Sequence, residues 1–279
     1  MRLHVVLPDE SATMPMSRLV ELARQAEELG FAGIWLPDHL LPPSDYGPVY
    51  GGVYEPLTTL AYLAAATNRV VLGTSVLILP LREPILLAKQ AATLAHVSGG
   101  RFILGVGTGW ESYEFDAVGA DFATRGAATT AALHLIRQLH TGSYADEHHT
   151  FDSRAVFQPV PETSVPVLIG GNSDAALRRA ALLGDMWQSV GLTPAEFVAR
   201  RNRLRELGGD AVSAGARDSW DSDARPVDDL IDRIQEWNKA GADDLALHFG
   251  PVDGFGERMH TLAAALRRLD WPIASNTRE

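Results

Sequence analysis

The chain of 279 residues is long for one ordinary domain and typical of one α/β barrel, and its apolar side chains, 46% of the total, are enough for a large core. The lack of cysteine excludes disulfides, thiolate nucleophiles and cysteine-ligated metal sites. The formal net charge of −11 argues against nucleic acid as a partner, because nonspecific binding to phosphates depends on clustered cations.

The amino-terminal residues MRLHVVLPDE contain an apolar run that is too short for a secretory signal peptide. No stretch of the sequence approaches the roughly 18 to 20 consecutive apolar residues of a membrane span. We therefore expect a cytoplasmic protein whose partner is a small-molecule substrate, with no binding to a membrane.

Short apolar, β-rich runs alternate with helical patterns along the chain. The first run, Leu3–Leu7, precedes Ser17–Leu29, in which apolar residues recur at helical spacing and Gly30 follows as a helix-ending glycine. The further pairs of strand and helix are predicted at Gly33–Leu36 and Leu57–Ala66, Val70–Val76 and Ile85–Val97, Phe102–Val106 and Thr124–Leu139, Val165–Ile169 and Asp174–Leu183, Met186–Val190 and Ala195–Leu207, Ala211–Ala214 and Val227–Ala240, and Leu245–Phe249 and Glu257–Leu269. Ala211–Ala214 is the weakest strand, because a stretch rich in Gly, Ser and Asp surrounds it.

This alternation of strands and helices predicts a (β/α)8 TIM barrel. The alternative is an open doubly wound sheet, which usually has fewer strands at this length. No linker divides the chain, so residues 1–279 are expected to form one domain, with a small hairpin insertion at Gly142–Pro161 before the fifth strand. In such a barrel the residues directly after each strand form the active site.

Asp38 and His39 follow the second strand, in the sequence IWLPDHLLPP. A histidine at this position can exchange a proton with a reacting atom near neutral pH, and a nearby carboxylate can orient it. The alternative is that Asp38 caps the loop and His39 only packs at the barrel mouth. Position alone favours neither interpretation.

The third strand, VVLGTSVLIL, is interrupted by Gly73, Thr74 and Ser75. Such an interruption indicates a bulge or the close approach of a ligand to the backbone. A strand with a polar kink is the alternative interpretation.

Three glycines, Gly105, Gly107 and Gly109, end the fourth strand in GRFILGVGTGW. Their GxGxG spacing differs from the GxGxxG of a dinucleotide-binding turn, and the lysine of a phosphate-binding P-loop is absent. What remains is a backbone without side chains, followed by Trp110, on which a flat ring can lie. The glycines could equally serve tight packing and a turn.

The fifth strand ends in PVLIGGNSDAALRRAA, where Gly170 and Gly171 precede Asn172 and Ser173 at a helix start. Free backbone N–H groups and the positive end of the helix dipole make this turn a predicted anion site.

The run Asp146-Glu147-His148-His149 resembles a metal cluster, but it lacks the HExxH spacing and lies in the predicted insertion, so we predict no metal site. A Ser-His-Asp hydrolase is disfavoured because the chain contains no GxSxG motif.

Three long segments, ELGFAGIWLPDHL, VVLGTSVLILPLREPILLAKQAATLAHVSGGRFILGVGTGWESYEF and PVLIGGNSDAALRRAALLGDMW, are similar to those of the bacterial luciferase-like oxidoreductases. The resemblance covers nearly the whole chain. Its Asp-His pair, GTSVL strand and GVGTG turn look most like the branch that uses the deazaflavin coenzyme F420 instead of FMN.

The resemblance implies a role for each matching position. A non-prolyl cis peptide would fall at Ser75-Val76 and form a bulge behind the cofactor ring. His39 would lie near the reactive carbon, and the neighbouring cofactor contacts would come from Asp38, Thr74, Ser75, Val76, Gly107, Thr108 and Gly109. The cofactor phosphate would be bound by Gly170, Gly171, Asn172 and Ser173.

The sequence departs from the family pattern at the position after GTG. Relatives that oxidise sugar phosphates have a glutamate there, whereas this chain has Trp110. Trp110 and Glu111 are therefore predicted to contact a different substrate, while Glu114 matches a common structural position of the motif.

These observations lead to one functional expectation and two alternatives. We expect an F420-dependent enzyme that transfers a hydride between C5 of the deazaflavin and a small organic substrate, with His39 as proton donor or acceptor. The alternatives are an FMN-dependent monooxygenase on the same fold and a non-catalytic barrel that binds a flavin. By analogy with the family, the protein is expected to form a homodimer.

Overall fold

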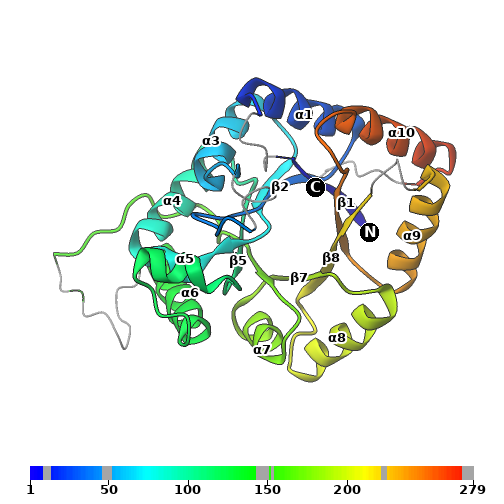
Figure 1. Ribbon diagram of the computed structural model, residues 1–279. Helices are drawn as coiled ribbons and strands as arrows, with labels where there is room; N and C mark the ends of the chain where they lie inside the picture. Colours follow the sequence, from blue (N-terminus) through cyan, green and yellow to red (C-terminus); the bar gives the residue numbers. More distant parts are fainter. Residues whose placement is uncertain (9–13, 46–51, 143–150, 152–153, 221–224, 272–279) are drawn as a thin grey trace.

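The computed structural model describes residues 1–8, 14–45, 52–142, 151, 154–220 and 225–271, and these form a closed barrel of parallel strands with helices around it (Figure 1). Its strands are β1 (Arg2–Val6), β2 (Gly33–Leu36), β3 (Val71–Thr74), β4 (Leu77–Ile78), β5 (Phe102–Gly107), β6 (Val167–Gly170), β7 (Met186–Val190), β8 (Ser213–Ser219) and β9 (Asp244–His248). The sheet closes because β5 pairs with both β3 and β4. The prediction of a TIM barrel is therefore confirmed, and the open sheet is excluded.

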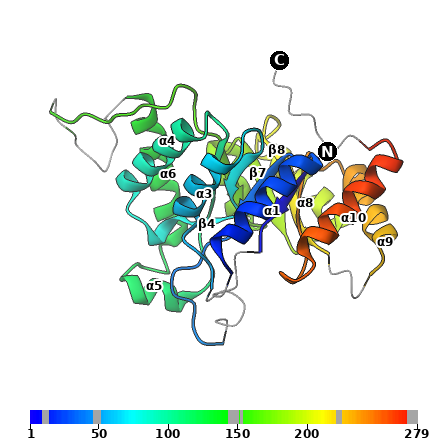
Figure 2. The same cartoon turned by 90° about the horizontal axis from the view of Figure 1, so that it is seen from above.

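Helices cover the outside of the barrel and follow the strands in turn. They are α1 (Met16–Leu29), α3 (Pro56–Ala66), the short 3₁₀ helix η1 (Leu79–Leu81), α4 (Pro84–Val97), α5 (Ser112–Val118), α6 (Arg125–Thr141), α7 (Asp174–Leu183), α8 (Pro194–Glu206), α9 (Val227–Lys239) and α10 (Phe255–Arg268). In Figure 2, α5 lies toward the bottom of the view and the amino terminus toward the top, so the two mark opposite ends of the barrel. Among the residues described, no helix has both the length and the apolar character to cross a membrane.

The third barrel strand is divided into β3 and β4 by a cis peptide bond between Ser75 and Val76. The bond lies where the family resemblance implies it, so this expectation is confirmed. The division also explains why GTS interrupts an otherwise apolar run: β3 pairs with β2, whereas β4 pairs only with β5.

The seventh barrel strand, β8, differs from its predicted range of Ala211–Ala214. It begins at Ser213 and continues to Ser219, and its polar residues resemble those of a loop in the sequence. The reason is its alternation: Ala214 and Ala216 are buried against the helices, whereas Arg217 points toward the pocket at the barrel mouth. Asp218 accepts a hydrogen bond from Trp237 Nε1 on α9, 2.9 Å away.

The predicted hairpin before the fifth barrel strand, Gly142–Pro161, is only partly within the described residues. Phe151 and residues 154–161 have no strand, and Gly142 ends α6 as its left-handed cap. The run Asp146-Glu147-His148-His149 lies outside the described residues. Elsewhere in the described part of the chain, no group of three His, Asp or Glu residues is arranged to hold a metal ion.

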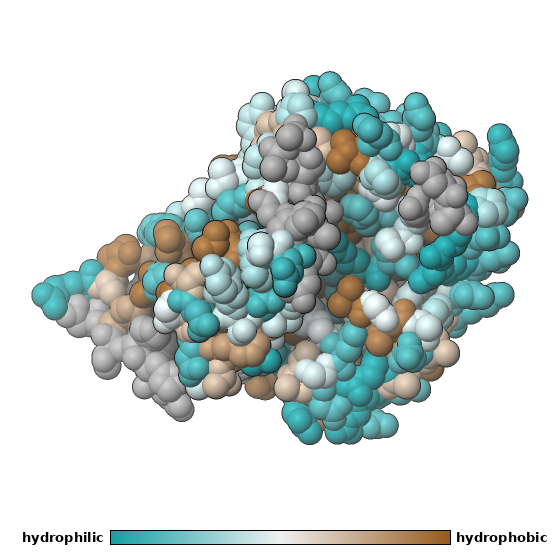
Figure 3. All heavy atoms as spheres, viewed as in Figure 1, coloured by the Kyte–Doolittle hydropathy of each residue, from teal (hydrophilic) through white to brown (hydrophobic). Residues whose placement is uncertain are grey.

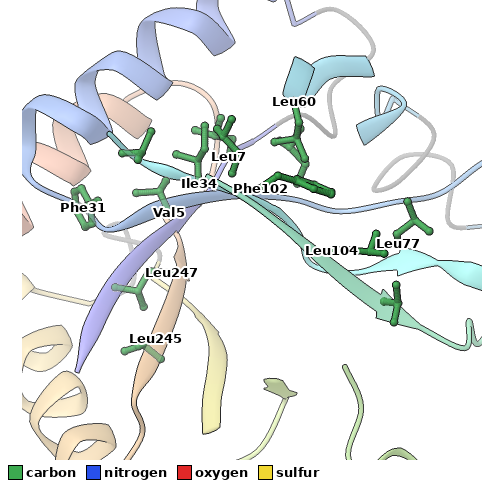
Figure 4. Packing of buried hydrophobic residues seen from close by; sticks show 14 of the residues in the cluster. Val5, Leu7, Phe31, Ile34, Leu60, Leu77, Phe102, Leu104, Leu245 and Leu247 are labelled. Carbon is green, nitrogen blue, oxygen red and sulfur yellow. The ribbon is translucent and has the colours of Figure 1, made fainter. Parts of the chain in front are cut away.

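Two sets of apolar side chains stabilise the barrel. Outward-facing residues such as Val5, Ile34 and Leu247 fill the layer between strands and helices (Figure 4). A smaller inner cluster contains Val6, Trp35, Leu168, Met186 and Ala246. Each fully buried side chain of this size contributes roughly 1.5–3 kcal/mol through burial. Figure 3 shows hydrophobic atoms in small groups among hydrophilic ones over the face seen there.

Trp35 fills the inside of the barrel above Gly73. A Cβ atom at Gly73 would lie 2.0 Å from Cζ3 of the indole ring. Gly73→Ala is therefore expected to lower the free energy of unfolding by about 1–3 kcal/mol through overpacking, as measured by urea denaturation.

A matched control for this substitution is Gly126→Ala in α6. A Cβ atom at Gly126 meets its nearest neighbour at 3.5 Å, an ordinary contact. Helix propensity then predicts an unchanged or slightly higher stability. Equal losses in the two variants would contradict the steric explanation.

Candidate active site

A pocket of about 460 Å³ lies at the carboxyl ends of the strands, where a TIM barrel has its active site. Its lining comes from the ends of β2, β5, β6 and β7, from β8, and from the segment between β3 and η1. The lining residues are Pro37, Asp38, His39, Ser75, Val76, Ile78, Gly107, Thr108, Gly109, Trp110, Gly170, Gly171, Gln188, Val190 and Arg217. Most residues that the sequence predicts for the site meet here, whereas Thr74, Glu111, Asn172 and Ser173 do not line the pocket.

His39 is held in place by Glu114, the third residue of α5. Its Nδ1 lies 2.9 Å from Glu114 Oε2, and the imidazole is only 8% exposed. Glu114 is fully buried, and its Oε1 accepts hydrogen bonds from the backbone N–H groups of Leu40 and Leu41, at 2.7 and 2.9 Å. Because a carboxylate only accepts hydrogen bonds, Nδ1 of His39 donates to Glu114.

Trp110 forms the rim of the pocket beside His39. The two rings contact edge to face, with centroids 5.8 Å apart, and the tryptophan is 51% exposed. Glu111 has a different environment: its side chain accepts from the N–H of Tyr113 and caps the start of α5. Of the two predicted substrate-contacting residues, Trp110 alone reaches the pocket.

Asp38 is buried, and both of its carboxylate oxygens are engaged by other residues. Oδ1 and Oδ2 accept from the Arg82 guanidinium at 2.8 and 2.6 Å, and Oδ2 also accepts from the N–H of Ile78 at 2.7 Å. Burial raises the pKa of the Asp38 carboxyl, and the paired guanidinium opposes this shift. Asp38 thus fixes the end of β2 to β4 and η1, while its predicted contact with a cofactor stays a prediction.

Thr74 and Ser75 face different surroundings, although they are adjacent. Thr74 is fully buried, and its hydroxyl donates to the carbonyl of Gly105 at 2.6 Å and accepts from the Gly105 N–H at 3.0 Å. Ser75 lies in the pocket wall and donates to Gln188 Oε1 at 2.6 Å. Its carbonyl accepts from Arg217 Nη1 at 2.8 Å, across the barrel from β8.

Val76 occupies the space above two of the predicted glycines. A Cβ atom at Gly107 would lie 2.6 Å from Val76 Cγ2, and one at Gly170 would lie 2.8 Å from Val76 Cγ1. At Gly109, with φ of +76°, the nearest atoms belong to Ile78 and Phe115, each at 2.8 Å. Gly107 and Gly170 therefore leave room for the Val76 side chain, which packs against both of them and lines the pocket.

The predicted anion site lies at the start of α7. Ser173 caps the helix by accepting from the N–H of Ala176, and Gly171 has a φ of +119° that favours glycine. Asn172 instead links this turn to the next strand, because its Nδ2 donates to the carbonyl of Val190 at 2.8 Å. Since the Gly171 N–H donates to the Gln188 carbonyl, an anion would be bound by the N–H groups of the first helical turn.

Sequence reasoning missed three pocket residues or their partners: Glu114, Gln188 and Arg217. Gln188 was visible as a polar residue within the apolar strand MWQSV, which is a signal for a side chain facing the barrel mouth. Arg217 was hidden because its strand was weakly predicted. Glu114 was assigned to a structural position, and its contact with His39 spans 75 residues.

His248, at the end of β9, is largely buried near Arg217. Burial, together with the charges of Arg217 and Arg258, lowers the pKa of its imidazole from 6.5 to about 4. Between these two values the unfolded chain binds a proton that the folded chain does not. The contribution of His248 to stability is therefore complete above about pH 6.5 and is lost as the pH falls toward 4, by no more than about 1.4 kcal/mol per pH unit.

A test of this linkage compares the wild type with His248→Gln in urea denaturation at pH 7 and pH 5. We expect the wild type to lose more stability than the variant over this interval, because glutamine does not titrate. Parallel losses in the two proteins would show that His248 does not contribute to the acid sensitivity.

The fold and the pocket define a luciferase-like TIM barrel, and comparison with known families agrees. The sequence model of the luciferase-like monooxygenase family matches residues 1–217. The chain belongs to this family, as the sequence resemblance indicated. A protein of Mycobacterium tuberculosis named as uncharacterized is 31% identical over 270 residues, covering 90% of this chain and 91% of that protein.

Two relatives with named activities are oxidoreductases of different kinds. An F420-dependent glucose-6-phosphate dehydrogenase of Kineococcus radiotolerans is 36% identical over 60% of this chain and 50% of its own length. The alkanal monooxygenase alpha chain of Photorhabdus laumondii is 30% identical over 63% of this chain and 49% of its own length. The predicted classification as an enzyme of the luciferase-like family is confirmed.

A solved structure has the same fold at low identity. A structure titled as an F420-dependent secondary alcohol dehydrogenase in complex with an F420-acetone adduct superposes with a TM-score of 0.76 at 17% identity, covering 95% of this chain and 99% of that one. At this identity the likeness establishes the fold alone.

Proposed function

We propose that the protein is a coenzyme F420-dependent oxidoreductase that transfers a hydride between C5 of the deazaflavin and a small organic alcohol or carbonyl compound. The observation that carries the proposal is the His39–Glu114 pair, which presents one imidazole nitrogen to a pocket at the barrel mouth. The names of relatives that use F420 add support, since one is a glucose-6-phosphate dehydrogenase and one structure is an alcohol dehydrogenase.

The residues of the pocket fit a flat, tricyclic cofactor with an anionic tail. Val76 and the backbone at Gly107 and Gly109 would lie along the ring, and the turn Gly170–Ser173 at the start of α7 would bind the phosphate. Pocket glycines are needed because a Cβ atom at Gly107 would collide with Val76. When bound, the deazaflavin supplies the hydride chemistry, and the protein supplies orientation and proton transfer.

Side chains of the protein would supply proton transfer, orientation of the imidazole and exclusion of water. His39 exchanges a proton at Nε2 with the substrate oxygen: it accepts the proton of an alcohol that loses a hydride, and it returns the proton to a carbonyl in the reverse direction. Glu114 fixes the ring orientation of His39 through Nδ1. Trp110 covers this corner and leaves less room for water beside the imidazole.

The second candidate is an FMN-dependent monooxygenase, in which reduced flavin activates oxygen. The alkanal monooxygenase relative favours this candidate, because its matched region has a similar length and identity to that of the dehydrogenase. Both candidates place a flat ring in the same pocket. The identity of the bound cofactor, F420 or FMN, distinguishes the two candidates.

The test is a fluorescence and absorbance titration of the purified protein with F420 and with FMN, side by side. We expect tighter binding of F420, and substrate-dependent reduction of F420 by one of a panel of primary and secondary alcohols. Clear preference for FMN, together with oxygen consumption, would replace our proposal with the monooxygenase. Binding without turnover of any alcohol, ketone or aldehyde in either direction would remove the assigned reaction.

A further inference from the structure

Three large apolar side chains are exposed beside His39. Leu40 and Leu41 directly follow His39 and are 39% and 54% exposed. Trp110, which lines the pocket and contacts the imidazole edge to face, is 51% exposed. Single exposed apolar residues are common on protein surfaces, but a group of them beside a reactive side chain indicates a surface for an apolar ligand. We call Leu40, Leu41 and Trp110 the apolar corner of the pocket.

The backbone of Leu40 and Leu41 is fixed by the same buried carboxylate that orients His39. Glu114 Oε1 accepts hydrogen bonds from the two leucine N–H groups at 2.7 and 2.9 Å, while Oε2 lies 2.9 Å from His39 Nδ1. Both leucine side chains nevertheless stay exposed. Covering them with an apolar group removes their surface from water, which is favourable, and the anchored backbone keeps them in place for this contact.

Trp110 is anchored by the helix that carries Glu114. Gly109, the residue before Trp110, packs on Phe115 of α5: a Cβ atom at Gly109 would lie 2.8 Å from Cε2 of this fully buried ring. Figure 2 shows α5 at the end of the barrel opposite the amino terminus. Helix α5 therefore sets the position of Trp110 relative to the two leucines, and a preorganised surface of this kind loses little conformational entropy when a ligand binds.

The side chains of the apolar corner carry no charge, and the charged residues nearby are engaged elsewhere. Glu111, which follows Trp110, accepts from the N–H of Tyr113 at the start of α5. Arg217, the arginine among the residues that line the pocket, donates to the Ser75 carbonyl at 2.8 Å, and its strand β8 is a neighbour of neither β2 nor β5. Proteins bind phosphate groups with cations and backbone N–H groups, so the apolar corner favours an uncharged ligand.

From this arrangement we propose that the substrate is an apolar alcohol, or the matching aldehyde or ketone, whose carbon chain lies on the apolar corner, and that Trp110 is a specificity-determining residue. The inference rests on the proposed function for the reacting group, whose oxygen exchanges a proton with His39. Because the indole contacts the imidazole, the chain attached to this oxygen lies within reach of Trp110, and longer chains reach Leu40 and Leu41. Each CH₂ group that is covered adds to the affinity, whereas a sugar phosphate gains nothing from the same surface.

The test measures dissociation constants for the straight-chain alcohols from ethanol to octanol, and for glucose 6-phosphate, by isothermal titration calorimetry. The protein is loaded with whichever of F420 and FMN it binds, or used alone if it binds neither. We expect the dissociation constant of the wild type to fall about two- to fourfold for each added CH₂ group, with no saturable binding of glucose 6-phosphate. The kcat/KM for the same alcohols should rise in parallel.

Substitutions in the apolar corner should remove this dependence on chain length. Trp110→Ala is expected to weaken binding of octanol by about 10- to 100-fold and of ethanol by less than about threefold. Trp110→Phe retains an aromatic face and should keep most of the dependence. Leu41→Ala should weaken octanol binding by about two- to fivefold.

Leu86→Ala is the matched control for Leu41→Ala. Leu86 lies on α4 and is 57% exposed, close to the 54% of Leu41, so both variants remove a similar apolar surface. The control should leave every dissociation constant unchanged. Circular dichroism and thermal unfolding check the fold of each variant, and Leu41→Ala carries the test where Trp110→Ala fails to fold.

Failure of this inference and failure of the proposed function give different results. If the wild type shows the dependence on chain length, and Trp110→Ala loses it, but no alcohol is oxidised, the proposed function fails and the apolar corner is supported as a binding surface. Oxidation of alcohols without this dependence, or preference for glucose 6-phosphate, would overturn the apolar corner alone. An unchanged dependence in Trp110→Ala, with a shift of oligomeric state in sedimentation velocity, would assign these side chains to a contact between copies of the chain and overturn it as well.

Discussion

Replacing His39 with asparagine is expected to lower kcat by about 10²- to 10⁴-fold, the usual contribution of a general acid or base. Asparagine retains a hydrogen-bonding side chain of similar reach but cannot take up a proton near neutral pH. Because His39 touches the pocket from one corner, the dissociation constant of the cofactor should change little. The measurements are steady-state kinetics with a turned-over alcohol and a cofactor titration of the same preparation.

Glu114→Gln is the companion variant. The glutamine can still accept from the N–H groups of Leu40 and Leu41, but its amide can donate to Nδ1 of His39 and so favours the opposite tautomer. We expect a smaller loss of kcat than in His39→Asn, with a change in the pH dependence of kcat. A purely structural role of Glu114 would leave the pH profile in place. Full activity of His39→Asn would end its assigned role.

Asp38→Ala is expected to cost about 3–5 kcal/mol of the free energy of unfolding, the effect of breaking a buried ion pair. The Asp38 side chain is completely buried and that of Arg82 is 11% exposed, so the substitution leaves a guanidinium in a poorly solvated site with Glu55, 3.5 Å from Nη2, as its remaining carboxylate partner. It also removes the acceptor of the Ile78 N–H. Urea denaturation at neutral pH measures the loss.

A double variant tests the physical reason for this loss. If the loss of the Asp38 carboxylate beside the Arg82 charge dominates, adding Arg82→Met to Asp38→Ala should restore part of the stability, because the poorly solvated cation is then removed. If the hydrogen bond to Ile78 dominates, the double variant should be no more stable than Asp38→Ala. A loss below about 1 kcal/mol in Asp38→Ala would contradict the buried pair as a stabilising element.

Much of the barrel was predictable because its strands obey a simple rule. Central parallel strands are buried on both sides, so they appear as short apolar runs between helical patterns, and Leu3–Leu7 and Phe102–Val106 are clear cases. The strand β8 differs, because it contains charged and polar residues. Arg217 and Asp218 have partners that only the folded barrel brings near, so their polarity looked like that of a loop.

The candidate site was predictable in its position but not in its contacts. His39, Gly107 and Trp110 follow strands directly, so the barrel alone places them at the mouth. The partners of these residues are distant in sequence, and no local pattern reveals them. Thr74 shows the limit clearly: it lies in the predicted segment, yet its hydroxyl faces Gly105 inside the wall rather than the pocket.

The bond between Arg217 and Ser75 spans 142 residues of the chain. During synthesis, the ribosome must therefore produce more than three quarters of the polypeptide before this hydrogen bond can form. Until then the segment between β3 and β4 lacks its hydrogen bond from β8, and the strands already made cannot close the barrel. The wall of the pocket that contains Arg217 is therefore complete only after most of the chain has been synthesised.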